Sequence, residues 1–238
     1  VSAGNTVALM TLGLKLVGRL EGIQRPALMS YIPHSAGLTG MLDLGANLNV
    51  DALALFQFAL MGSVVRSGRG GLGNNPTLGL LNVGHEDSKG DSVLREAHER
   101  LQASDLNYEG FIEGHDLFTG RVDVAVCDGF AGNLILKSSE GLAEMLFAEL
   151  RNTLNSGPRA RLGAWFAGPA LRQMLARLDP DKHNGAPLLG LRGVVVKSHG
   201  RSGPRATTHA ILEAGREVEK NVPARIAEAV HRYHAEDN

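Results

Sequence analysis

The sequence predicts a doubly wound α/β/α sandwich, in which helices cover both faces of a parallel sheet. Apolar runs at 41–47, 78–84 and 193–200 each end in glycine with asparagine, lysine or histidine, and a fourth leads into the glycines and the amide of 124–133. Uninterrupted apolar runs are typical of strands buried on both faces of a sheet. Ligands of such folds lie beyond the carboxyl ends of the strands, so the residues after each run are candidate site residues.

The expected elements are separated mainly by glycine and proline, which interrupt regular structure. The strands are the apolar runs, and the helices are segments in which apolar residues recur three or four positions apart. In chain order we expect a helix near 6–18, a strand near 40–44, a helix near 51–65, a loop at 67–76, a strand near 77–83, a helix near 91–103, strands near 108–112 and 122–127, helices near 132–154 and 168–178, a strand near 193–197 and a long helix from about 206.

Composition places the chain among ordinary globular proteins. Its 238 residues are 43% hydrophobic and 21% charged, enough for a large core in a single domain over 1–238. A formal net charge of −1 without blocks of like charge gives no reason to expect nucleic acid as a partner. The single cysteine, Cys127, excludes an intramolecular disulfide and a cysteine-rich zinc site, as expected in a reducing cytoplasm.

The start of the chain is abrupt. Val1 is not a methionine, and 1–6 resembles the end of a strand that feeds a helix near Val7. We therefore expect that this domain lacks an N-terminal segment.

Seven motifs, in order along nearly the whole chain, resemble those of the PlsX family of bacterial phosphate acyltransferases. An ordered set is much more specific than any single glycine pattern. The motifs lie at 2–6, 43–47, 57–62, 82–90, 127–133, 184–190 and 197–200. The chain departs from the family in three places: an N-terminal segment rich in Asp and Gly is absent, Val7 stands where glycine is usual, and His85 stands where glutamate is usual.

The resemblance implies an acyltransferase that moves a fatty acyl group from acyl carrier protein to inorganic phosphate, giving acyl phosphate for phospholipid synthesis. It also implies a fold similar to those of phosphotransacetylases and isopropylmalate dehydrogenases, and a homodimer. The next user of the product would be a membrane-embedded glycerol-phosphate acyltransferase. No cofactor and no metal ion are expected.

This reaction needs groups that hold phosphate and stabilise the oxyanion formed at the thioester carbon. Ser2, Asn5 and Thr6 lie at a helix start, where N–H groups and the positive end of the dipole favour an anion. Plain N-capping is the simpler interpretation of these three residues taken alone.

Two residues are candidates for the catalytic step itself. Lys89 lies in a loop between a predicted strand and a predicted helix, next to Gly90, and the resemblance assigns a catalytic lysine to this position. An isolated loop lysine is otherwise usually just solvated. Asn133 offers amide donors without adding charge, and the alternative for it is a turn or helix cap.

Further polar residues follow other strands. Asn47, Asn82 and Asp128 would line the same crevice if the sheet is parallel, although a carboxylate repels phosphate and more readily orders a loop. Lys197 and His199 end another strand and are candidates to complete an anion pocket. A histidine could also serve as a general base, but phosphate is already a competent nucleophile.

Three tempting signals do not support other chemistry. The glycines of 68–73 fit G-x-G-x-x-G, but they follow a helical stretch and not a strand. The acidic and histidine side chains of 85–87 are adjacent on one loop, and such residues seldom converge on one metal ion. Cys127 follows Val126 with no identifiable base, so a buried strand cysteine is favoured over an acyl-enzyme nucleophile.

A protruding helical hairpin is expected over 137–180. Apolar residues recur at helical spacing on both sides of a Gly-Pro break at 157–158, with arginines between them. The resemblance implies a homodimer packed through this region. Trp165 and Phe166, beside arginines, would also let the hairpin contact an anionic membrane, with the protein otherwise cytoplasmic.

Three other functions remain open on the sequence alone. A phosphotransacetylase-like enzyme would use acyl-CoA in place of acyl carrier protein. A nicotinamide-dependent dehydrogenase is suggested by fold analogy, but no dinucleotide fingerprint follows a strand. A chain left catalytically incomplete would act as a membrane-docking module.

Overall fold

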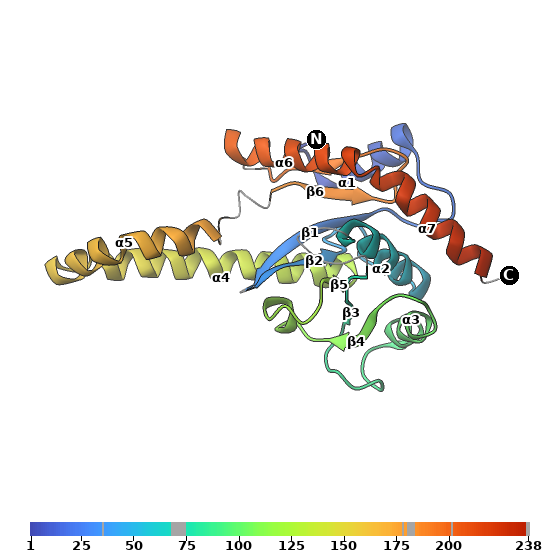
Figure 1. The fold of residues 1–238 in the computed structure, drawn as a ribbon, viewed down its shortest axis with the longest axis horizontal. Coiled ribbons are helices and arrows are strands. Elements are labelled where there is room, and N and C mark those ends of the chain that lie inside the picture. The colour runs from blue at the N-terminus through green and yellow to red at the C-terminus, as the bar shows by residue number, and fades with distance from the viewer. Residues whose placement is uncertain (35, 68–74, 178, 180–183, 201, 237–238) are drawn as a thin grey trace.

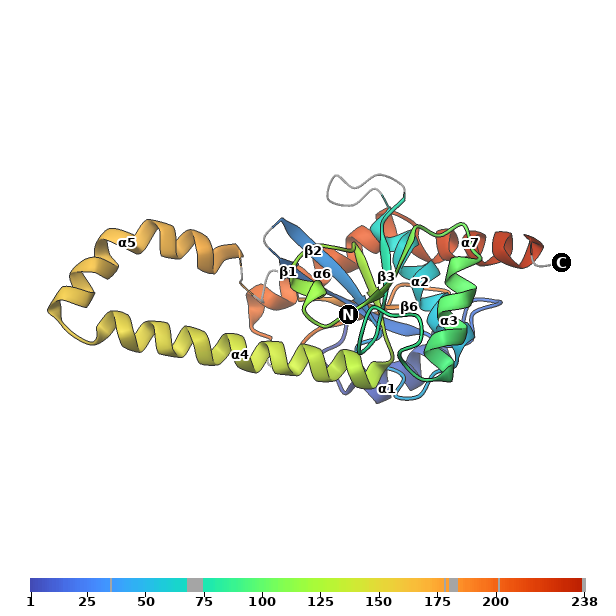
Figure 2. The ribbon, with the colours of Figure 1, turned by 90° about the horizontal axis from the view of Figure 1, so that it is seen from below.

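The computed structural model describes residues 1–34, 36–67, 75–177, 179, 184–200 and 202–236. Figure 1 shows a sheet with helices on both sides, from which one helical hairpin projects. Figure 2, turned by 90°, shows the hairpin extending from the body in that view as well. Within the described ranges, none of the helices combines the length and hydropathy needed to span a bilayer.

Seven strands form one sheet in the described part of the chain, and half of it is parallel. In spatial order the strands are β4 (Tyr108–Ile112), β3 (Leu78–Leu81), β5 (Val124–Val126), β2 (Gly37–Leu42), β1 (Ala27–His34), β6 (Ala186–Leu189) and β7 (Val196–Lys197). The first four run parallel, with β3 and β2 on either side of β5. These four are the strands predicted between 40 and 127.

The other half of the sheet is antiparallel, which corrects the prediction of a parallel sheet. β1 pairs antiparallel with both β2 and β6, and β7 pairs antiparallel with β6. The sequence prediction omits β1 and β6, and each contains a proline, Pro33 or Pro187, a residue that is unfavourable inside a sheet. Pro33 is tolerated because it lies beyond Ala27 and Leu28, the two residues of β1 that pair with β6.

The helices match most of the predicted segments. They are α1 (Thr6–Leu12), continued by the π-helical turn η1 (Gly13–Val17), α2 (Ala52–Arg66), α3 (Ser92–Gln102), the 3₁₀ turn η2 (Asp116–Phe118), α4 (Gly129–Asn155), α5 (Pro158–Arg177), α6 (Pro204–Glu219) and α7 (Val222–Glu236). The C-terminal segment is two helices and not the single helix predicted. Asn221 has a φ of 48°, which ends α6, and Pro223 starts the next helix.

Side chains of the sheet alternate between two apolar clusters. Val124 and Val126 of β5 belong to the cluster that α2, α3 and α7 cover. Ala125 and Cys127 belong to a second cluster, against which α1 and α4 pack. The period of two along β5 therefore places helices on both faces, and the predicted α/β/α layering is confirmed.

Candidate active site

The parallel strands end at the same level, which brings their following residues together. Leu42 of β2, Val126 of β5 and Leu80 of β3 are register partners across the three neighbouring strands. Neighbouring strands lie about 4.8 Å apart. The segments that follow β2, β5 and β3, beginning at Asp43, Cys127 and Asn82, therefore leave the sheet side by side, as the sequence predicted.

The loop after β2 is organised around the buried carboxylate of Asp43. It accepts hydrogen bonds from the N–H groups of Leu28 at 2.8 Å, Ala46 at 3.3 Å and Asn47 at 2.6 Å, and from the Asn47 amide at 3.0 Å. Burial raises the pKa of Asp43, and these hydrogen bonds partly oppose that rise. The Asn47 amide also donates to the carbonyl of Pro26 at 2.8 Å. Both amide protons of Asn47 are therefore used inside the protein, which corrects its predicted role as a phosphate donor.

The start of α4 packs directly on this loop through two glycines. The Gly129 N–H donates to the Asn47 carbonyl at 2.7 Å. A Cβ at Gly132 would lie 1.9 Å from the Asp43 carbonyl oxygen, so only glycine fits there. Asp128 caps the helix by accepting from the Ala131 N–H at 2.7 Å. Its carboxylate thus orders the helix start, the alternative to substrate contact that the sequence favoured.

Asn133 lies one turn into α4, with an exposed side chain. It stands over Gly45 in the loop after β2, where a Cβ would lie 3.4 Å from the Cβ of Asn133. Gly45 has a φ of +101°, which favours glycine. The amide of Asn133 is therefore presented to the carboxyl edge of the sheet and does not act as the helix cap.

Residues 82–90, the Lys89 loop, follow β3 and lead towards α3. Asn82 is 8% exposed, and its side-chain oxygen accepts from the Val83 N–H at 2.8 Å. Within the described residues its Nδ2 has no hydrogen-bond partner. Gly90, with a φ of +84°, packs against this amide, and the exposed Lys89 passes over Gly84. The loop thus encloses an unsatisfied donor and carries a cation.

Two histidines tie the Lys89 loop to its surroundings, which the sequence did not predict. His85 contacts Asp116 at 2.9 Å and Glu113 at 3.2 Å in the turn after β4. Asp87 lies 3.5 Å from His98, a buried side chain of α3. One sequence feature could have indicated these contacts. The residues Glu-Gly-His-Asp directly follow the strand at 108–112, which ends at the same edge of the sheet as β3.

The pKa of Asp116 reflects this network. Burial alone would raise it, but hydrogen bonds from the Glu113 N–H and His85, with Arg121 and His115 nearby, lower the pKa of Asp116 below its usual range. Asp116 is therefore a carboxylate at neutral pH and can accept from His85. Among the described residues, no group of three or more His, Cys, Asp or Glu side chains is arranged to hold a metal ion.

The remaining predicted residues gather at a different place. β7 runs opposite to β6, so Lys197 and His199 leave the sheet towards the other edge. Ser2 pairs with Lys197 in a parallel bridge. Lys197 and His199 stay predicted candidates for an anion pocket, but their strand runs antiparallel to β6, and a two-residue strand does not reveal its direction in the sequence.

Contacts within this second group are a helix cap and hydrogen bonds between neighbouring loops. Asn5 caps α1 by accepting from Val7 N–H at 2.9 Å and Ala8 N–H at 3.2 Å, the simpler of the two interpretations above; Thr6 is the first residue of that helix. Asn184 accepts from the His199 N–H at 2.9 Å. Burial, with Lys137 of α4 nearby, lowers the pKa of Lys197.

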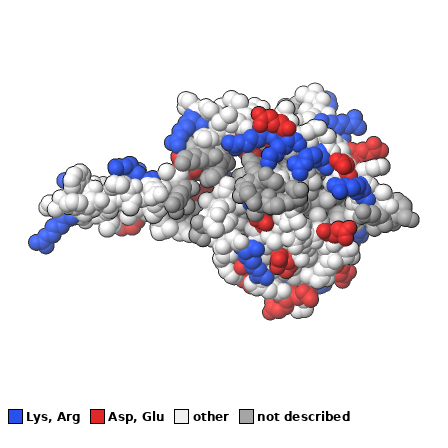
Figure 3. All heavy atoms as spheres, in the orientation of Figure 1, with Lys and Arg blue, Asp and Glu red and all other residues white. Residues whose placement is uncertain are grey.

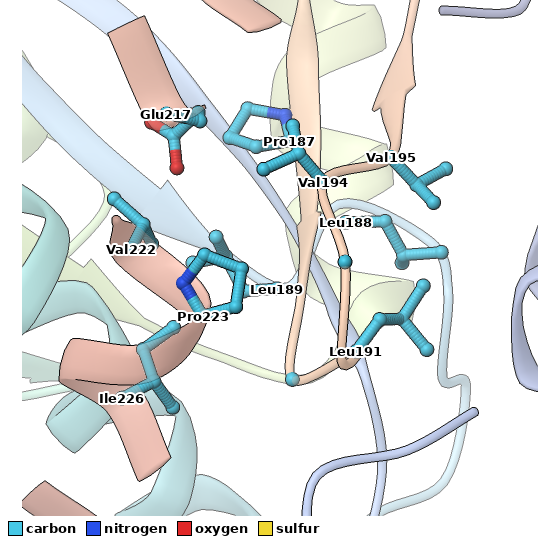
Figure 4. A pocket seen from close by; sticks show the side chains of 12 residues that line it. Pro187, Leu188, Leu189, Leu191, Val194, Val195, Glu217, Val222, Pro223 and Ile226 are labelled. Atoms are coloured by element: carbon cyan, nitrogen blue, oxygen red, sulfur yellow. The ribbon is translucent and has the colours of Figure 1, made fainter. Parts of the chain in front are cut away.

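A small cavity lies elsewhere, between the β6–β7 turn and the α6–α7 junction. Figure 4 shows Glu217 on one side of it and Leu188, Leu189 and Ile226 among the other lining side chains. Its volume is about 10 Å³, room for roughly one water molecule. This cavity is too small for a phosphate or an acyl chain.

Cys127 is expected to be unreactive in the folded protein. It is 2% exposed, and its thiol lies 3.6 Å from the Asp43 carbonyl. Burial, with the charges of Asp43 and Asp128, raises the pKa of the Cys127 thiol well above its usual value. An aromatic disulfide reagent should label one thiol in urea and almost none in buffer at about pH 8. Rapid labelling of the native protein would contradict the buried position.

The chain can now be compared with known proteins. A family model described as "Fatty acid synthesis protein" matches residues 1–225. A curated phosphate acyltransferase from Photobacterium profundum is 47% identical over 230 residues, 96% of this chain and 67% of the relative. One from Nitrosococcus oceani is 48% identical over 227 residues, 95% of this chain and 66% of the relative.

The fold is of the α/β class, with polar residues at the ends of its parallel strands. The chain belongs to the fatty acid synthesis protein family, and the relatives just described are phosphate acyltransferases, enzymes of the acyltransferase class. The resemblance noted in the sequence is confirmed. The chain spans about two thirds of the length of these curated relatives, as the shares of 67% and 66% show.

Two solved phosphotransacetylases are similar in shape at a lower level. The EutD phosphotransacetylase from Staphylococcus aureus has a TM-score of 0.47 at 14% identity, over 97% of this chain and 60% of that one. A phosphotransacetylase from Streptococcus pyogenes has a TM-score of 0.49 at 14% identity, over 91% and 61%. At this level of similarity neither structure adds to the description of the site. The glycines of 68–73, which fit a dinucleotide pattern but were not predicted to bind a dinucleotide, lie outside the described residues.

Proposed function

We propose that the protein transfers a long-chain acyl group from acyl carrier protein to inorganic phosphate, and that the reaction takes place at the carboxyl edge of β2, β5 and β3. Membership of a family whose members include phosphate acyltransferases supports the reaction type. The family resemblance described above is the basis for proposing acyl carrier protein as the acyl donor. It is also the basis for proposing that the acyl phosphate is used in phospholipid synthesis.

The buried amide of Asn82 is the observation that supports this location for the phosphate. Its Nδ2 has no partner among the described residues, and Lys89 lies in the same loop. An unsatisfied buried donor costs about 1–3 kcal/mol, which a phosphate oxygen in the loop would recover. The lysine would supply the opposite charge. A cation in the same loop as an unsatisfied amide donor suits hydrogen phosphate.

The chemistry needs no covalent enzyme intermediate. An oxygen of hydrogen phosphate attacks the thioester carbon, the C–S bond breaks, and the phosphate proton passes to the departing sulfur to give the carrier thiol. The positive charge of Lys89 would offset the negative charge of the phosphate and of the developing oxyanion. The Asn133 amide would donate a hydrogen bond to that oxyanion. Cys127, buried behind the Asp43 loop, takes no part.

The other candidate residues have supporting roles in this proposal. Asn47 and Asp128 hold the loop after β2 and the start of α4 in place. Ser2, Asn5, Thr6, Lys197 and His199 are assigned no contact with the reacting atoms in this proposal, which is supported by the pairing of Ser2 with Lys197 in a strand antiparallel to β6.

Acyl-CoA is the alternative donor, and a competition assay separates the two. Equal concentrations of long-chain acyl carrier protein and acyl-CoA would be mixed with phosphate, and release of each thiol carrier would be followed. Preferential consumption of the acyl carrier protein supports the proposal. Preferential consumption of acyl-CoA would make the protein a phosphotransacetylase-like enzyme, and consumption of neither would favour a docking module without turnover.

A second proposal concerns the hairpin of α4 and α5. Both helices of this hairpin expose apolar side chains at helical spacing. They are Leu142, Met145 and Leu146 on α4, and Leu162, Trp165 and Phe166 on α5. Figure 3 shows Lys or Arg side chains near the far end of a hairpin that is otherwise mostly uncharged. We propose that two copies pack through this hairpin and that its aromatic residues contact an anionic membrane, with the protein cytoplasmic and peripherally associated. An amphiphilic acyl phosphate would then be released near its membrane-embedded user.

Replacing Trp165 and Phe166 by serine is expected to weaken binding to anionic vesicles by at least about tenfold, because each ring contributes roughly 1.5–3 kcal/mol when buried. The rings are 73% and 70% exposed, and their centroids lie 4.8 Å apart. Co-sedimentation with vesicles measures the effect. The adjacent exposed pair Ile211 and Leu212 on α6, changed to serine, is the matched control. Unchanged sedimentation with a shift from dimer to monomer would assign the rings to packing alone.

A further inference from the structure

His85 joins the Lys89 loop to the turn after β4 through two carboxylates. Its Nε2 lies 2.9 Å from Oδ2 of Asp116, and its Nδ1 lies 3.2 Å from Oε1 of Glu113. Asp116 is itself held by the Glu113 N–H at 2.9 Å, and its side chain is 8% exposed. The turn at 113–116 is therefore held by its own hydrogen bond, and the contacts of His85 attach the Lys89 loop to it.

The geometry has a consequence for the protonation state of His85. A neutral imidazole carries one N–H and can donate to only one of the two carboxylates, while its other nitrogen turns a lone pair towards the second. An imidazolium donates from both nitrogens, and hydrogen bonds between charged groups are the stronger ones. Both contacts of His85 are satisfied together only when its ring is protonated.

We propose that His85 is a positioning residue: its protonated ring ties the Lys89 loop to the turn at 113–116 and so holds Lys89 at the carboxyl edge of the sheet. This inference rests on the proposed function, because Lys89 is the group being positioned. Protonation favours the tied loop. The tie is therefore stronger when the ring carries both N–H groups than when it carries one.

Arg121 and His115 are further charged or titratable residues near the two carboxylates. Arg121 lies 3.4 Å from Asp116 and offsets one of the two carboxylates. His115 lies 3.6 Å from Asp116 and 3.7 Å from Glu113, beyond good hydrogen-bond distance. His115 belongs to the same turn as both carboxylates, so its protonation changes the local charge without joining the loop to the turn.

The Lys89 loop itself brings further charges near His85. Glu86 and Asp87 follow His85 in the sequence and are the acidic residues of the loop. Asp87 is also 3.5 Å from His98 of α3, which holds the far side of the loop. Loss of the His85 contacts should therefore loosen the loop locally and leave α3 in place.

Hydrogen exchange of the 82–95 peptide, measured by mass spectrometry without substrate, tests the proposal. After correction for the intrinsic rate, exchange in the wild-type protein should be about two- to fivefold slower at about pH 5.5 than at about pH 8. His85→Gln, which cannot gain charge, should exchange at the faster rate at both pH values. His85→Arg, charged throughout, should exchange slowly at both.

His115→Gln is the matched control and should keep most of the wild-type pH dependence. Three results would each overturn the proposal: no pH dependence in the wild-type protein, an unchanged pH dependence in His85→Gln, or its loss in His115→Gln. His85 is 38% exposed on a surface loop, and His85→Arg keeps a charge, so a result does not depend on one variant folding.

The readout also separates this inference from the proposed function. A loop that responds to pH as described, in a protein without phosphate-dependent turnover, would leave the His85 tie standing and remove the acyltransferase. Phosphate-dependent turnover with a loop indifferent to pH would do the reverse. If both hold, kcat/KM for phosphate should fall with rising pH more steeply in the wild-type protein than in His85→Arg.

Discussion

Replacing Lys89 by alanine should reduce phosphate-dependent acyl transfer by about 10²- to 10³-fold while the protein stays folded. This is the range expected when one preorganised group that stabilises the developing oxyanion is removed. Lys89 is exposed and makes no contribution to the apolar clusters, so its loss should not move the unfolding midpoint. Initial rates of carrier thiol release, with circular dichroism for the fold, measure both effects.

Lys15→Ala is the matched control for that experiment. Lys15 is also exposed but lies in η1, in the turn that continues α1. It should leave both the rate and the stability within error of the wild-type protein. Wild-type turnover in Lys89→Ala would remove Lys89 from the mechanism, and an equal loss in both variants would point to a general effect of surface charge.

Gly132→Ala is the substitution with the largest expected effect on the structure. The added methyl group would lie 1.9 Å from the Asp43 carbonyl oxygen and 3.0 Å from the Cys127 sulfur. Backbone on both sides would have to separate, because α4 rests directly on the loop after β2. Overpacking of this kind costs about 1–3 kcal/mol or more, so the urea midpoint should fall clearly. Activity should also fall, because a displaced α4 would move Asn133, the residue after Gly132.

Gly141→Ala in the same helix provides the comparison. Beyond its own stretch of helix, a Cβ at Gly141 would meet no atom of the described residues within 4 Å. Alanine is favoured over glycine in a helix interior by roughly 0.5–1 kcal/mol, so this variant should be slightly more stable than the wild-type protein. A Gly132→Ala protein as stable as the wild type would show that α4 does not pack on the loop as described.

The parallel half of the sheet and the edge that it forms were predictable from the sequence. Long apolar runs followed by glycine and amide residues are a local signal, and the strands that carry Asp43, Asn82 and Asp128 lie in register as expected. The strand-to-helix turn before α4 was also predicted, although the helix begins at Gly129 and not near 132 as expected. Local chemistry therefore located this candidate site.

Features that depend on distant partners were not predictable in the same way. The direction of β7, two residues long, is set by pairing with β6 and not by its own residues, so the sequence did not reveal which edge of the sheet Lys197 and His199 approach. The contacts of His85 depend on a turn about thirty residues later in the chain, which contributes two carboxylates. Its neighbours in the sequence give no indication of them.

Formation of acyl phosphate is the most direct test of the account. Long-chain acyl carrier protein would be incubated with the protein and with increasing inorganic phosphate, and acyl phosphate would be trapped as its hydroxamate. The account predicts a product that requires phosphate, saturates with it, and is lost in Lys89→Ala. Carrier release without phosphate, or a hydroxamate yield equal in the wild-type and Lys89→Ala proteins, would contradict transfer to phosphate at this edge of the sheet.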